Sequence, residues 1–176
     1  GENAFNSCSS LTSVTLGSSV TSIGSGAFYY CTALTNFSVN AANAVYSSLN
    51  GVLFNKAQTI LIQFPAGRAG SYVIPNSVTD IGAGAFGGCT SLTSVTFPKN
   101  VTSIWFNAFS GCIGLTNLSV NAANPAFSSL NGVLFNKAQT ILLQFPTGRG
   151  GSYVIPNSVT NIGYPAFSSC ASLTSV

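Results

Sequence analysis

The sequence predicts a mainly β protein: a β-solenoid of about seven coils with two β-hairpin inserts and little or no α-helix, a coil being one turn of the chain around the solenoid axis. A motif repeated along the whole chain, a regular spacing of cysteines, and short runs that alternate apolar and hydroxyl residues support this fold class. The motif reads Val-x-x-Ile-x-x-x-Ala-Phe-x-x-Cys. Its full copies end at Cys31, Cys89, Cys112 and Cys170, and a partial copy ends at Cys8.

The cysteines set the length of the repeats. The interval from Cys8 to Cys31 equals that from Cys89 to Cys112, and the longer interval from Cys31 to Cys89 equals that from Cys112 to Cys170. Short and long units therefore alternate, and together they form a super-repeat that runs from Cys8 to Cys89 and again from Cys89 to Cys170.

The super-repeat gives the domain organisation. Its copies 34–95 and 115–176 are identical at about four in five positions. We interpret residues 1–176 as a single solenoid with inserts at about 41–71 and 122–152, and we expect both ends to be cut within a repeat.

Each short unit contains two strand-like stretches. Leu11, Val14 and Leu16 have the Leu-x-x-Leu-x-Leu spacing that opens a leucine-rich repeat, and the hydroxyl residues between them point to the other face. A second extended piece carries Val20 and Ile23, followed by glycines that form a bend. The short interval between cysteines corresponds to a coil of about 23 residues, within the range of about 20–29 that leucine-rich repeats adopt. The opening spacing begins again at Leu34, Leu92 and Leu115.

The additional residues of the long unit predict a hairpin. Two β-prone runs, 52–54 and 60–62, flank the polar turn 55–58, and the stretch 49–75 is duplicated as 130–156. We therefore expect two hairpins that project from otherwise regular coils.

Composition excludes several classes of protein. Only 4% of the residues are charged, compared with about 25% in typical globular proteins, and the net charge of +3 forms no basic stripe. Nucleic-acid binding is therefore not expected. No apolar run reaches the length of about 18 residues that a membrane span requires, so we expect no membrane insertion.

The chain offers little for catalysis. It contains no histidine, and its only carboxylates are Glu2 and Asp80, which lie about three coils apart. We expect no enzyme activity, no cofactor and no metal site. We expect the cysteines to form no disulfides, because stacked coils hold their Cβ atoms farther apart than a disulfide allows. They are expected to be buried and to pack as small apolar side chains.

The repeats resemble those of a known protein family. The patterns Leu-x-x-Val-x-Leu/Phe-Pro, Val-Thr-Ser-Ile-Gly and Ala-Phe-x-x-Cys are similar to those of the BspA-like, or Treponema-type, leucine-rich repeats. The resemblance covers essentially the whole chain and implies a large surface or secreted protein of a host-associated bacterium or protist, with a role in adhesion. The sequence departs from the pattern at Trp105, which replaces a glycine, and at Tyr164-Pro165.

Exposed aromatic residues are the candidate ligand contacts. Trp105, Phe106, Tyr164, Tyr29 and Tyr30 occupy positions that elsewhere hold Gly, Ser or Ala, so we expect them to face solvent. The alternative is that they cover a neighbouring corner of the solenoid or the adjacent hairpin. The repeated Phe28, Phe86, Phe109 and Phe167 are instead expected in the core.

The sequence leaves three functions open. The leading hypothesis is an extracellular or cell-surface module that binds a protein or glycan on a host or neighbouring cell. The second is a structural spacer without a ligand of its own. Outward Ser and Thr ladders, such as Thr15 with Ser38, leave an ice-binding surface as a remote alternative. Unpaired strand edges at the cut ends could also allow end-to-end self-association.

Overall fold

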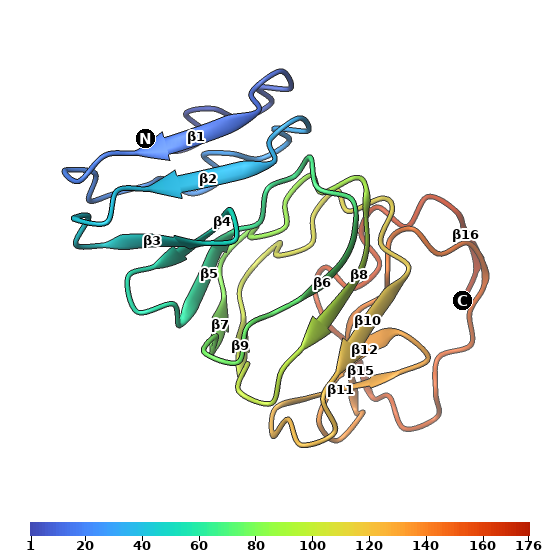
Figure 1. The fold of residues 1–176 in the computed structure, drawn as a ribbon. Coiled ribbons are helices and arrows are strands. Elements are labelled where there is room, and N and C mark those ends of the chain that lie inside the picture. Colours follow the sequence, from blue (N-terminus) through green and yellow to red (C-terminus); the bar gives the residue numbers. More distant parts are fainter.

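The computed structural model describes all 176 residues and contains sixteen strands and no helix. The chain winds as a solenoid from its N-terminal coil to its C-terminal coil (Figure 1). No helix has the length and apolar character needed to cross a membrane. The predicted mainly β solenoid of about seven coils is confirmed.

Parallel strands from successive units form one side of the solenoid, which we call the front sheet and which consists of three separately hydrogen-bonded sheets. They are β1 (Ser13–Leu16), β2 (Asn36–Val39), β6 (Gly70–Val73), β8 (Leu92–Phe97), β10 (Asn117–Val120), β14 (Gly151–Ser152) and β16 (Leu173–Ser175). Equivalent residues of neighbouring coils pair, as in Val14 with Phe37. Their side chains point inward and are stacked one coil apart, because the repeat keeps each apolar position in register.

The other strands form two meander sheets, one in each half. The first contains β3 (Tyr46–Leu49), β4 (Val52–Asn55), β5 (Ile60–Gln63), β7 (Asp80–Ile81) and β9 (Ser103–Ile104). The second contains β11 (Phe127–Leu130), β12 (Val133–Asn136), β13 (Ile141–Gln144) and β15 (Asn161–Ile162). In each sheet the first three strands are antiparallel and the later ones are added in parallel.

The predicted hairpins are present, but the expectation that they project is wrong. Val52, Leu53 and Phe54 of β4 are fully buried, and β5 pairs in parallel with β7, so the last strand of the insert is itself part of a coil. The Phe64 amide donates to the carbonyl of Ala85 in the next coil. The apolar run that resembled a hairpin arm therefore fills the core.

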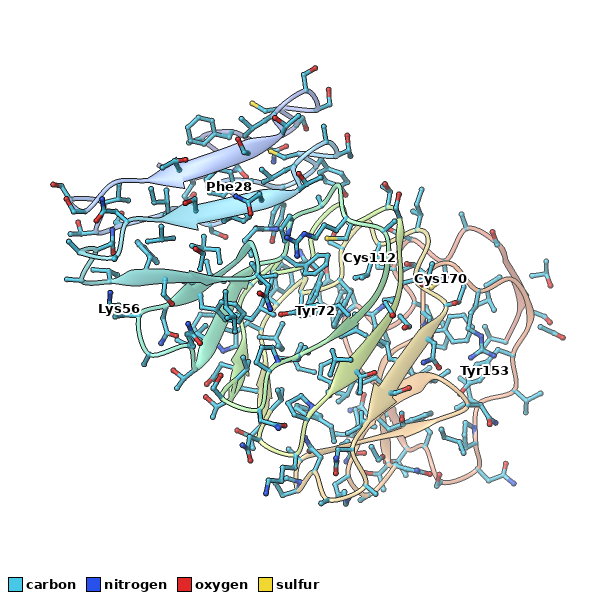
Figure 2. All side chains as sticks on the ribbon, viewed as in Figure 1. Phe28, Lys56, Tyr72, Cys112, Tyr153 and Cys170 are labelled. Carbon is cyan, nitrogen blue, oxygen red and sulfur yellow. The ribbon has the colours of Figure 1, made fainter.

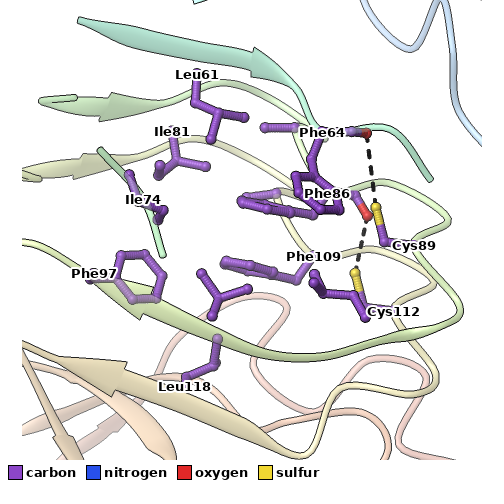
Figure 3. Close-up of a cluster of buried hydrophobic side chains, with 14 of the residues drawn as sticks. Leu61, Phe64, Ile74, Ile81, Phe86, Cys89, Phe97, Phe109, Cys112 and Leu118 are labelled. Carbon is purple, nitrogen blue, oxygen red and sulfur yellow. Dashed lines mark hydrogen bonds between the residues drawn. The ribbon is translucent and has the colours of Figure 1, made fainter. Parts of the chain in front are cut away.

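A ladder of phenylalanines and cysteines lies at the centre of the core (Figure 3). The ring of Phe86 lies 5.4 Å from that of Phe64 and 5.0 Å from that of Phe109, measured between centroids. The Cys112 thiol donates to the Phe86 carbonyl of the preceding coil at 3.0 Å. Burial raises the pKa of Cys89, with Cys112 adding to the effect, which keeps this thiol protonated at neutral pH.

All five cysteines are free, as predicted, but two differ from the predicted burial. Cys31, Cys89 and Cys112 are fully buried, whereas Cys8 is exposed and Cys170 is half-buried. These two lie in the first and last copies of the motif, where fewer coils stack on them.

The aromatic ladder runs in three sections. Neighbouring rings pack from Phe5 to Phe28, from Phe64 through Phe86 to Phe109, and from Phe145 to Phe167; the Phe64–Phe86 pair is tilted and the other three pairs are stacked. The same three sections separate the core into three clusters of buried side chains. Both breaks occur where a meander sheet begins. There a front-strand amide donates to a carbonyl in the turn of the meander instead of to a carbonyl of the next coil. The Phe37 amide, for example, donates to the carbonyl of Gly51 at 2.9 Å.

A buried asparagine ties each meander to the preceding corner. The Asn124 side-chain amide donates to the carbonyls of Pro98 and Val101 at 2.9 and 2.8 Å. Its oxygen accepts from the amides of Ala126 and Phe127 at 2.9 and 2.7 Å. Asn43 makes the equivalent four bonds in the first half. Neither residue was predictable from the sequence, because an asparagine in a loop resembles an ordinary turn residue.

The cations of the inserts also hold the backbone. Lys56, at the outer rim of the first meander (Figure 2), donates to the Ala41 carbonyl at 3.0 Å. The Arg68 guanidinium donates to the Thr35 carbonyl at 2.8 Å. In the second half Lys137 makes the equivalent bond to the Ala122 carbonyl, whereas Arg149 donates to the carbonyl of Asn131. These charges therefore bind loops of their own chain rather than forming a charged surface.

Candidate binding cleft

Three of the five candidate ligand contacts lie around one hollow at the second break of the aromatic ladder. This aromatic cleft has a volume of about 200 Å³. Its walls include Trp105, Phe106, Leu143, Gln144, Tyr164 and Pro165. The residues come from three consecutive coils and include both departures from the repeat pattern.

The repeat itself positions the aromatic side chains. Trp105 directly follows β9, and its backbone amide donates to the Ile81 carbonyl of the preceding coil at 2.9 Å. Phe106 and Tyr164 stand at equivalent positions of their units, and their rings stack at 5.9 Å with an interplanar angle of 16°. Trp105, Phe106 and Tyr164 are 48%, 59% and 85% exposed, so large apolar surfaces face water here, as predicted.

The first half of the chain contains a counterpart, which we call the glycine cleft. It has a volume of about 250 Å³ and lies at the first break of the ladder. Gly24, Ser25 and Ala83 occupy the places that Trp105, Phe106 and Tyr164 take in the next copy of the super-repeat. Trp105 also lines this cleft, so the two hollows adjoin along one face.

A small polar hollow of about 20 Å³, enough for about one water-sized group, lies beside the aromatic cleft. It is lined by Asn107, Ser110, Gln144 and Ser168, and it shares Asn107 and Gln144 with the cleft itself. Gln144 is fixed by its side-chain amide, which donates to the Phe145 carbonyl at 2.9 Å. Sequence analysis did not identify these residues, because serine and asparagine are common at every corner of this chain.

Tyr29 and Tyr30 lie apart from the aromatic cleft. Tyr29 is half-buried against glycines of the next coil: a Cβ at Gly84 would overlap its ring, and one at Gly87 would lie 2.9 Å from it. Tyr30 covers Gly88 and Gly111 but stays 40% exposed. The expectation that Tyr29 faces solvent is therefore wrong. The alternative, that such a residue covers a neighbouring corner, describes it correctly.

The polar hollow lies where the second half has a small residue in place of Tyr29. The equivalent of Tyr29 in the second copy of the super-repeat is Ser110, and the equivalents of Gly84 and Gly87 are Pro165 and Ser168. A small side chain at 110 leaves open the space that the Tyr29 ring fills in the first half. Compared with the glycine cleft, the aromatic cleft therefore combines aromatic walls with an adjacent polar hollow.

The aromatic cleft and the polar hollow are lined by apolar and neutral polar side chains. None of the seven charged residues of the chain lines the aromatic cleft or the polar hollow, and neither contains a thiol. Outside the cleft, burial raises the pKa of Tyr72 to about 12, against a smaller lowering by Arg68. No group of three or more His, Cys, Asp or Glu side chains forms a candidate metal site. The available interactions are stacking, dispersion and neutral hydrogen bonds.

The front sheet presents the predicted hydroxyl ladder in separate pieces. Thr15 pairs with Ser38, and Thr96 pairs with Ser119, as the spacing predicts. The two pairs belong to different sheets, and Val73, which aligns with Thr96, is exposed. The ladder is thus not the continuous flat Thr array that an ice-binding surface requires.

Comparisons with known proteins agree with this architecture. No curated protein matches the sequence. The fold is similar to the crystal structure of the pneumococcal vaccine antigen PcpA, with a TM-score of 0.68 and 23% identity over 93% of this chain and 38% of that one. It is also similar to a leucine-rich repeat protein from Eubacterium ventriosum, with a TM-score of 0.65 and 26% identity over 99% of this chain and 46% of that one.

The chain thus spans less than half the length of both structures. The family model described as "BspA type Leucine rich repeat region (6 copies)" matches residues 1–67, 63–148 and 150–176. Together these matches cover almost the whole sequence, and the repeat that they describe is the coil seen in the structure. The chain belongs to the BspA-type leucine-rich repeat family.

Proposed function

We propose that this chain is a non-enzymatic, adhesin-like module of a secreted or cell-surface protein, and that its aromatic cleft binds a protein or glycan partner. One observation carries the proposal: Trp105, Phe106 and Tyr164, which depart from the repeat, converge on a single hollow. The likeness to a pneumococcal vaccine antigen supports an extracellular location.

The repeat does not need these aromatic side chains. Gly24, Ser25 and Ala83 occupy the same places in the first half, where the coils stack in the same way. The three rings of the aromatic cleft therefore expose apolar surface to water without a structural requirement. Exposed aromatic residues are typical anchors of binding interfaces, because a partner buries much apolar area at a small cost in side-chain entropy.

A spacer remains the second candidate. The observation in its favour is the front sheet, where most outward positions carry small hydroxyl side chains that pair across strands and stabilise the sheet by themselves. A spacer would need no hollow with aromatic walls. The two functions therefore make opposite predictions for the aromatic cleft.

The test is a binding screen of the chain against extracellular-matrix proteins and glycans. The variant Trp105→Gly, Phe106→Ser, Tyr164→Ala gives the aromatic cleft the residues of the glycine cleft, a combination that the fold already accommodates. The control, Val73→Thr, Val154→Thr, removes exposed apolar side chains from the front sheet instead. Binding by the parent and control but not by the variant, with unchanged circular dichroism, supports the proposal. Equal binding by all three proteins refutes the site, and no binding by the parent favours the spacer.

A further inference from the structure

We infer that the aromatic cleft and the polar hollow together form a site for an uncharged glycan, in which one sugar ring stacks on the aromatic side chains and one of its hydroxyl groups bonds in the hollow. The inference rests on the proposed function and names the ligand class of the same site. Three properties of the site support it: its shape, its lack of charge, and its differences from the glycine cleft.

The shape suits a single ring. The cleft volume of about 200 Å³ is below the roughly 300–1,000 Å³ of pockets that bind drug-sized ligands. A cavity of about 150 Å³ nevertheless holds a benzene ring. The stacked rings of Phe106 and Tyr164 lie nearly parallel, and Tyr164 is 85% exposed, so an aromatic face is open to solvent. The C–H groups on one face of a pyranose pack well against such a surface.

The charge of the site excludes ionic recognition. Its polar groups are the amides of Asn107 and Gln144 and the hydroxyls of Ser110 and Ser168. The Gln144 amide nitrogen already donates to backbone carbonyls, so this side chain offers its oxygen as an acceptor. The Asn107 amide and the serine hydroxyls can both donate and accept hydrogen bonds, as sugar hydroxyls do. An acidic glycan or a phosphorylated ligand would lose its hydration here without meeting a cation, which is costly. The site therefore favours a neutral ligand.

Comparison with the glycine cleft separates a sugar site from a simple apolar hole. An anchor for a leucine or proline side chain would need the aromatic walls alone. In the second half, Ser110 in place of Tyr29 has also opened a polar hollow beside those walls. An aromatic face next to neutral hydrogen-bonding groups matches the two parts of a pyranose: its C–H face and its ring of hydroxyls.

Intrinsic fluorescence gives a direct test, because Trp105 is the only tryptophan and lines the cleft. The probes are neutral oligosaccharides built from glucose, galactose, mannose or N-acetylglucosamine. Sialylated and sulfated oligosaccharides and apolar peptides serve as competitors. We expect a neutral oligosaccharide to change the Trp105 emission, with a Kd that varies less than about twofold between low and high salt.

Two variants examine the two parts of the site. Tyr164→Ala removes an aromatic face and should weaken binding about tenfold, the upper range for an aromatic contact. Ser110→Ala, Ser168→Ala removes both hydroxyls and should weaken the neutral sugar by a similar factor while leaving any apolar peptide unaffected. The Val73→Thr, Val154→Thr control should bind like the parent.

The possible failures are distinguishable. Binding of a protein or peptide alone, abolished by Tyr164→Ala, would overturn the glycan inference and leave the proposed function intact. Preference for acidic glycans, or binding that falls steeply with salt, would also overturn it. If no protein, peptide or glycan bound the chain, the proposed function and the inference would both fail.

Discussion

Replacement of Asn124 tests how the meanders are attached to the solenoid. Its side chain is fully buried and makes four hydrogen bonds to backbone groups. Asn124→Ala leaves two carbonyls and two amides without partners, and at about 1 kcal/mol of net stability for each bond the loss should be about 4 kcal/mol. That is a large part of the roughly 5–15 kcal/mol by which a typical domain is stable.

The same loop provides a matched control. Asn121 is exposed, and its side-chain oxygen accepts one hydrogen bond, from the Ala123 amide at 2.9 Å. Asn121→Ala should therefore cost about 1 kcal/mol or less. Urea unfolding followed by circular dichroism measures both variants, and hydrogen exchange at the Ala126 and Phe127 amides shows whether the loss is local.

The comparison can refute the reasoning. If Asn124→Ala unfolded at the same urea concentration as Asn121→Ala, the four buried bonds would not be what ties the meander to its corner. Unchanged exchange at the Ala126 and Phe127 amides would lead to the same conclusion. Because Phe127 also lines the aromatic cleft, a loosened meander should weaken ligand binding as well.

Three further predictions concern the core and its titratable groups. Phe86→Ala should cost about 3–5 kcal/mol in urea unfolding because the ring is fully buried, whereas Phe5→Ala, at a half-exposed ring, should cost clearly less; equal losses would contradict the stacked ladder. The Tyr72 pKa of about 12 lies above its unfolded value of about 10, so its contribution to stability is complete below pH 10 and declines as the pH rises through 12; this decline should be smaller in Tyr72→Phe, where Tyr29 and Tyr153, whose pKa values burial also raises, still contribute, and identical curves would contradict the assignment. A thiol reagent should modify Cys8 in the folded protein and reach Cys112 only on unfolding; rapid modification of Cys112 would contradict its burial.

Sequence periodicity predicted the coils because in-register stacking imposes the same side chain at the same place in each turn. The pairing of Thr15 with Ser38 and the burial of Phe86 follow directly from that rule. Periodicity could not predict whether the inserts project or enter the core, because β-prone runs such as 52–54 have the same pattern in a projecting hairpin and in a buried strand. Only the packing of the neighbouring coils decides between them.

The candidate site was predictable in part. Trp105 and Tyr164 were identified as departures from the repeat, yet they belong to units that are far apart in the sequence, and only the structure places them on one cleft. The sequence suggested that Tyr29 is exposed in the same way as Trp105. Its ring instead packs against Gly84 and Gly87 in the next coil. Repeat spacing assigns a residue to a coil, whereas the partner that it meets depends on the exact size of side chains in another coil.

The packing of Tyr29 limits which pieces of this array evolution can exchange. A large ring at 29 faces Gly84, whereas the small Ser110 shares its hollow with Pro165, and the two members of each pair belong to different units. Recombination that moved one unit alone between the halves would bring two bulky groups into collision or leave a void between two small ones. A segment carrying both members of a pair can be copied without repacking, and the duplicated super-repeat is long enough to do so.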